Sequence, residues 1–102
     1  MAIAQQTVGN TATTLYTSSG VTAITALYLM NDNSGTVVIQ LHVVADGDTA
    51  VTANKIIKNL SIAAGDTYVV DTERLILDDG DTIQAVADTD AVVHSTISYI
   101  GV

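Results

Sequence analysis

The tripeptide Gly-Asp-Thr occurs three times in the last two-thirds of the chain, each time where a turn would lead into a strand. The copies begin at Gly47, Gly65 and Gly80. Glycine accepts the positive φ angle of a tight turn, aspartate accepts hydrogen bonds from nearby amides, and β-branched threonine favours strands. The copies are 18 and 15 residues apart and their flanking sequences differ, so they indicate recurring turn chemistry and not an internal repeat. The triplets therefore predict an all-β fold.

Alternation of apolar and polar residues between the turns predicts about eight strands, whereas helical periodicity is weak. The strands are expected at residues 13–17, 21–31, 36–44, 55–62, 67–71, 74–77, 82–87 and 92–100, with a loop at 46–54. The short turn at residues 32–35 is expected to join the second and third strands as a β-hairpin. Short, closely spaced strands predict a single-domain antiparallel β-sandwich over residues 13–102, preceded by an N-terminal arm or short edge strand at 1–12. The strand order, jelly-roll or immunoglobulin-like, is left open.

Two of these segments allow a prediction of which side chains face the core. In 36–44, the apolar set Val37, Ile39, Leu41 and Val43 is expected to point inward, and His42 outward to the surface. In 55–62 the inward set is expected to be Ile56, Leu60 and Ile62, although Ile57 and Lys58 interrupt the alternation.

The composition restricts both the core and the possible partners. The hydrophobic share is 48% but aromatic residues are only 4%, with no Phe or Trp, so Val, Ile, Leu and Ala must fill the core. The lack of Cys excludes disulfides and thiolate metal sites. A net charge of −8 repels phosphate, so we expect neither nucleic acid nor an anionic membrane surface as a partner. No signal peptide or membrane-spanning helix is predicted.

The charges are unevenly distributed, because the first carboxylate in the chain is Asp32 and no Lys or Arg precedes it. One interpretation is a chance run of uncharged strands. The other is a surface buried against another subunit, because the cores of interfaces are depleted of charge. The interface residues predicted from this segment are Ile3, Val8, Leu15, Tyr16 and Val21.

The Asp-rich loops raise the question of a calcium site, since Ca²⁺ takes six to eight oxygen ligands. The candidate ligands are Asp46, Asp48, Asp78, Asp79 and Asp81. Neither cluster has the ligand spacing or terminal Glu of an EF-hand loop. We therefore expect the carboxylates to cap turn amides, and we expect no metal and no cofactor.

Catalytic chemistry is not predicted. The chain has no nucleophile elbow, no Cys and no phosphate-binding loop. Its two histidines, His42 and His94, are too few for a zinc site within one chain, although a symmetric trimer could bring three copies of one histidine together on its axis. We expect each to be a surface or interface histidine. The four tyrosines are expected at the edge of the core, with stacking on sugar rings as the alternative. We expect a protein that is not an enzyme and has no catalytic residues.

Read as a whole, residues 13–102 resemble the small β-sandwich virion proteins of tailed bacteriophages. The segments that carry the resemblance are ITALYLMN at 24–31, VVIQLHVV at 37–44, NKII at 54–57, LSIAAGDT at 60–67 and LDDGDTIQA at 77–85. The pattern Leu-x-x-Gly-Asp-x-Ile in the last of them also occurs in other viral and extracellular sandwiches. The resemblance implies a structural role on the particle, as a head decoration, neck or tail component.

The resulting expectation is a non-enzymatic virion subunit that docks on other virion proteins and forms a homo-oligomer, with a trimer favoured. Such a protein is made in the host cytoplasm and ends in the virion. Two alternatives remain: a carbohydrate- or receptor-binding module that uses the tyrosines and Asp loops, and a Ca²⁺-stabilised adhesin domain of a bacterial surface.

Overall fold

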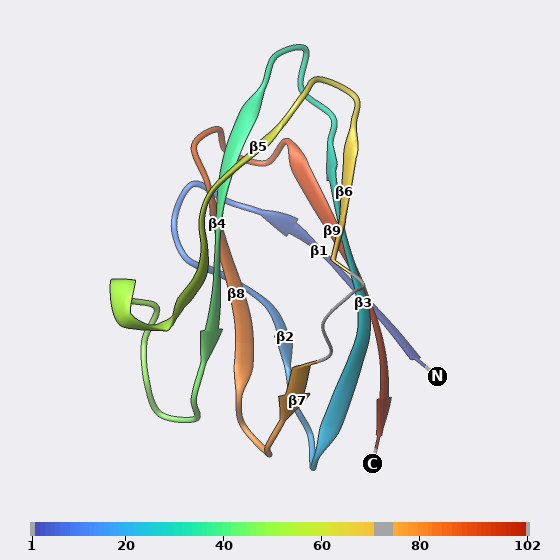
Figure 1. Cartoon of the computed structure of the whole chain (residues 1–102), viewed down its shortest axis with the longest axis vertical. Helices are drawn as coiled ribbons and strands as arrows, with labels where there is room; N and C mark the ends of the chain where they lie inside the picture. The colour runs from blue at the N-terminus through green and yellow to red at the C-terminus, as the bar shows by residue number, and fades with distance from the viewer. Residues whose placement is uncertain (1, 71–74, 102) are drawn as a thin grey trace.

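The computed structural model describes residues 2–70 and 75–101, which form nine strands and one short 3₁₀ turn (Figure 1). The elements are β1 (Ala2–Val8), β2 (Thr13–Thr17), β3 (Thr22–Asn31), β4 (Val37–Val44), η1 (Thr52–Asn54), β5 (Lys55–Ile62), β6 (Thr67–Val70), β7 (Leu75–Leu77), β8 (Thr82–Ala87) and β9 (Val93–Gly101). The eight predicted strands correspond to β2–β9 with bounds that differ by at most one residue. The predicted ends at Asp71 and Arg74 lie outside the described residues. No helix of the described residues is long and apolar enough to cross a membrane.

Two antiparallel sheets pack face to face, which confirms the predicted β-sandwich (Figure 1). One sheet has the order β1-β9-β3-β6, with β7 also paired to β3, and the other has the order β2-β8-β4-β5. The pairs β1·β9, β2·β8, β3·β6/β7 and β4·β5 are nested, like a long hairpin that has been rolled up. This is the jelly-roll order, and it differs from an immunoglobulin sheet, where strands A and B lie in one sheet.

The nested order overturns the predicted hairpin between residues 21–31 and 36–44. β3 belongs to the first sheet and β4 to the second, so the turn between them carries the chain across the sandwich. Among consecutive strands, only β4 and β5 pair with each other in the described residues. A short turn predicts a hairpin only where the next strand has no better partner, and here β4 pairs with β8 and β5 instead.

All three Gly-Asp-Thr triplets form the same kind of turn. Gly47, Gly65 and Gly80 have φ angles of 83°, 76° and 87°. In each case the Asp amide bonds to the carbonyl three residues earlier, at 3.0, 3.0 and 3.1 Å, which with one positive φ at the third position is a type II turn. The second and third triplets lead directly into β6 and β8, as predicted. The first does not start a strand, because residues after it form the loop that ends at β5.

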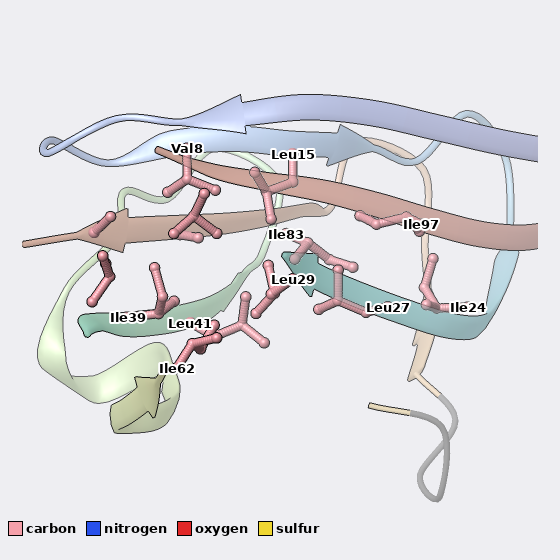
Figure 2. Packing of buried hydrophobic residues seen from close by; sticks show 14 of the residues in the cluster. Val8, Leu15, Ile24, Leu27, Leu29, Ile39, Leu41, Ile62, Ile83 and Ile97 are labelled. Carbon is pink, nitrogen blue, oxygen red and sulfur yellow. The ribbon is translucent and has the colours of Figure 1, made fainter. Parts of the chain in front are cut away.

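The core lies between the sheets and is aliphatic (Figure 2). Val37, Ile39 and Leu41 are fully buried and Val43 packs beside them, as predicted. Both sheets contribute: Ile24, Leu27, Leu29 and Ile97 from one and Leu15, Ile39, Leu41, Ile62 and Ile83 from the other. β1 also belongs to this core, because Val8 at its end has no exposed surface.

The predicted set of inward-facing residues in β5 is partly wrong, because the strand contains bulges. The register against β4 shifts twice, between the pairs Ile39↔Leu60, Leu41↔Ile57 and His42↔Lys55. Each bulge adds a residue and so reverses which side chains face inward. Ile57 therefore packs against the core, whereas Ile56, predicted to be inward, is 48% exposed.

Candidate functional surface

The broad outer face of the β1-β9-β3-β6/β7 sheet carries no Asp, Glu, Lys or Arg among the described residues. We call this surface the neutral face. By strand register and alternation its residues are Ile3, Gln5, Thr7, Ala23, Ala26, Tyr28, Met30, Thr67, Val69, Ile76, His94, Thr96, Ser98 and Ile100. Six large apolar side chains are exposed on it: Ile3, Tyr28, Met30, Val69, Ile76 and Ile100. A face that mixes exposed apolar and uncharged polar side chains has the composition of a protein–protein contact.

The described acidic residues lie in the turns and loops between the strands. Asp79 accepts a hydrogen bond from the amide of Gly20 at 2.8 Å. Asp81 accepts from the amides of Asp46 and Asp78, both at 3.0 Å. These carboxylates cap turns, as expected of Asp in such positions, and they tie neighbouring loops together. Within residues 2–70 and 75–101, no three His or acidic side chains are grouped as a metal would require.

The five predicted interface residues separate into three groups. Ile3 is 67% exposed and Val21 42% exposed, so both are accessible to a partner. Tyr16 is half-buried and packs against Tyr99, with ring centroids 4.5 Å apart and the rings tilted by 36°. Val8 and Leu15 are buried in the core, which corrects their assignment, since a side chain enclosed by its own fold has no surface to offer. Lack of charge in the sequence does not distinguish a core position from a contact position.

The two histidines lie on different sheets. His94 is part of the neutral face, and its Nδ1 is 3.1 Å from the Thr7 hydroxyl. His42 lies on the outer side of β4, as predicted, yet it is only 4% exposed, because the loop before β5 folds over it. Its Nδ1 is 2.8 Å from Asn54 Oδ1. The prediction of a surface or interface histidine is therefore wrong for His42, which its own chain covers.

The tyrosines do not form a stacking platform. Tyr16 and Tyr99 pack against each other at the edge of the core, and the Tyr16 hydroxyl is 3.3 Å from the Thr22 hydroxyl. Tyr28 and Tyr68 are exposed but project from opposite sides of their sheet, because Tyr28 pairs with Val69 whereas Tyr68 pairs with buried Leu29.

A polar depression lies on the described surface beside the neutral face. This depression, of about 370 Å³, is lined by Gln5, Gln6, Thr7, His94, Ser95 and Thr96, where β1 lies beside β9. It contains amides, hydroxyls and one imidazole, but no carboxylate to act with the imidazole as an acid–base pair. The neutral face and the strand edge beside it are therefore the surface with the clearest functional character.

Comparison of the chain with protein-family models, with curated proteins and with solved structures finds no match.

Proposed function

We propose that this chain is a non-enzymatic structural subunit of a bacteriophage virion. It would be made in the host cytoplasm and incorporated into the particle as a head decoration, neck or tail component. The observation that carries the proposal is the contrast between the neutral face and the acidic turns of a small jelly-roll domain. Jelly rolls are common in viral capsid proteins, and an uncharged, partly apolar face suits a subunit held by other proteins. The sequence resemblance to phage virion proteins supports the same function.

The neutral face is the proposed docking surface for the other virion proteins. A carboxylate placed at its centre would remain desolvated and unpaired in a docked complex, which costs several kcal/mol. Tyr28→Asp is the informative change, because Tyr28 is exposed at 41% on the central strand β3. Gln84→Asp is the matched control, since Gln84 lies on the outer side of the other sheet, on the central strand β8.

The test is co-expression of the tagged chain with the phage that encodes it, followed by density-gradient purification of the particles and quantitative mass spectrometry. We expect the wild type and Gln84→Asp in the particle fraction, and Tyr28→Asp reduced by at least tenfold. If the wild-type chain is missing from the particles, the proposal is wrong.

The same preparation tests the sugar-binding alternative on a glycan array. A reproducible signal that is lost in either Tyr28→Ala or Tyr68→Ala would replace the virion proposal with a lectin function.

A further inference from the structure

The four edges of this sandwich differ in how far they resist the addition of another strand. An edge strand has unpaired backbone N–H and C=O groups on one side, and proteins block such edges with charge, bulges or short length. β5 contains two bulges and carries Lys55 and Lys58. β2 has five residues and a register shift against β8. The described parts of β6 and β7 have only four and three residues.

β1 has none of these protections. It has seven residues and pairs with β9 without a register shift, from Ala2↔Tyr99 to Val8↔Val93. It contains no charged residue, no Pro and no Gly. Five of its seven residues are exposed, and no described strand pairs with its outer edge. β1 is therefore the one described edge that is open, long and regular.

We propose that β1 is the pairing edge for a second copy of this chain. Two β1 strands would add antiparallel about a two-fold axis, so that the β1-β9-β3-β6 sheets of the two copies form one continuous sheet. In the centred register Gln5 lies opposite Gln5 and Ile3 opposite Thr7. The two Gln amides can bond to each other, and Ile and Thr, both β-branched, make a favourable cross-strand pair. Because both copies use the same strand, the contact closes on itself.

The charge distribution favours a second copy as the occupant of this edge. Two chains of net charge −8 repel each other wherever their acidic turns approach. At β1 that repulsion is weakest, because no ionisable acid or base side chain occurs in residues 1–15. The Asp90 carboxylate accepts a hydrogen bond from the amide of Asn10, and this bond lies beyond the end of β1. The neutral face also continues across the junction, since Ile3, 67% exposed, lies on β1.

This inference does not depend on the virion proposal, and it predicts a dimer where the sequence favoured a trimer. The test is light scattering after size exclusion, in which a monomer has 10.6 kDa and a dimer twice that mass. Gln5→Lys and Gln5→Glu each place like charges opposite one another, so each variant alone is expected to weaken the dimer at least tenfold. An equimolar mixture of the two is expected to restore it, because Lys then faces Glu. Gln40→Lys, the same change on the outer side of β4, is expected to leave the dimer intact.

Several results would overturn the inference: a wild-type monomer at high micromolar concentration, a trimer, retention of the dimer by Gln5→Lys, or no rescue in the mixture. Amide hydrogen exchange of the wild type provides a check that needs no variant. Protection of residues 2–8 should increase with protein concentration, and protection that is independent of concentration contradicts the pairing. Failure of these tests leaves incorporation into particles unaffected, so the two proposals can fail separately.

Discussion

At the scale of single residues, one buried amide holds the end of the sandwich where the chain crosses between the sheets. Asn31 is fully buried at the end of β3. Its Nδ2 donates to the carbonyls of Gly35 at 2.9 Å and Ile62 at 2.8 Å, and its Oδ1 accepts from the amide of Asn33 at 2.9 Å. The side chain thus connects the turn after β3 to the end of β5. No apolar residue can satisfy these groups.

Asn31→Ala is expected to destabilise the fold by about 2–3 kcal/mol, because the buried Ile62 carbonyl, the Gly35 carbonyl and the Asn33 amide lose their partner. The measurement is the free energy of unfolding from urea denaturation. Asn59→Ala serves as the control, since Asn59 is exposed on β5, and a change within about 0.5 kcal/mol is expected there. Equal losses in the two variants would contradict the role assigned to Asn31.

The three identical turns allow a matched comparison of glycine substitutions. Gly65→Ala introduces only a left-handed alanine, since a Cβ at this position has no atom within 4 Å, and we expect a loss of about 1 kcal/mol. A Cβ at Gly80 would overlap the Asp46 carboxylate, an exposed side chain that must turn aside, so Gly80→Ala is expected to cost about 1.5–2 kcal/mol. Thermal unfolding of the two variants measures the difference. Adding Asp46→Gly should bring Gly80→Ala close to Gly65→Ala, and an unchanged gap would contradict the contact.

At the scale of elements, the loop between β4 and β5 acts as a cover for one side of β4. Asn54 organises it: Oδ1 accepts from the amide of Val51 at 3.0 Å, and Nδ2 donates to the carbonyl of Thr49 at 2.8 Å. Because Oδ1 only accepts, His42 must carry its proton on Nδ1 to complete the bond. The loop therefore closes over an imidazole that would otherwise be exposed.

Asn54→Ala is expected to open this loop and to cost about 1–2 kcal/mol of stability. Reaction with diethyl pyrocarbonate, mapped by mass spectrometry, reports the opening directly. In the wild type His94 should react faster than the buried His42, and in the variant the rate at His42 should rise several-fold while His94 stays unchanged. Unaltered protection of His42 would show that Asn54 does not hold the loop.

The elements also show what the sequence can and cannot predict. Strand positions follow from local alternation and turn residues, so β2, β5 and β8 have the bounds predicted for them. Strand partners do not, because β3 and β4 are separated by a short turn and still belong to different sheets. The prediction that Ile56 faces inward is wrong because β5 is bulged against β4, and a bulge depends on the partner strand. The prediction that Val8 lies at an interface is wrong, because Val8 is buried in the core. Which other segments pack on the end of a strand decides whether that end is buried, and local sequence does not show this.

The candidate surface was only partly predictable. The uncharged first third of the sequence suggested a contact surface, and two of the five residues predicted for it, Ile3 and Val21, are exposed. Half of the neutral face, however, comes from β6, β7 and β9, which are brought beside β1 and β3 only by the nested topology. The open edge of β1 likewise becomes visible only when all four edges of the sandwich can be compared.

At the scale of the whole molecule, the nested topology makes folding a non-local process. β1 pairs with β9, and β2 with β8, so the chain must bring distant segments together before most strands have a partner. Refolding is expected on a timescale of about milliseconds to seconds, as for other sandwiches of high contact order. Because the sequence has no Pro, a proline-limited phase of tens of seconds should be absent. Stopped-flow tyrosine fluorescence measures both, and a dominant sub-millisecond phase or a slow minor phase would contradict them.

The pairing of β1 with β9 also determines how the molecule would respond to mechanical load. Ala2 lies opposite Tyr99, so both ends of the described chain leave from the same corner of one sheet (Figure 1). A force that pulls these ends apart acts along the inter-strand hydrogen bonds, which lie perpendicular to the strands in an antiparallel pair. The bonds are then broken one after another from the open end, as in unzipping, and none shares the load with the next. Force applied through the broad sheet faces instead loads many contacts at once, so a subunit held by those faces is mechanically much stronger than one held by its ends.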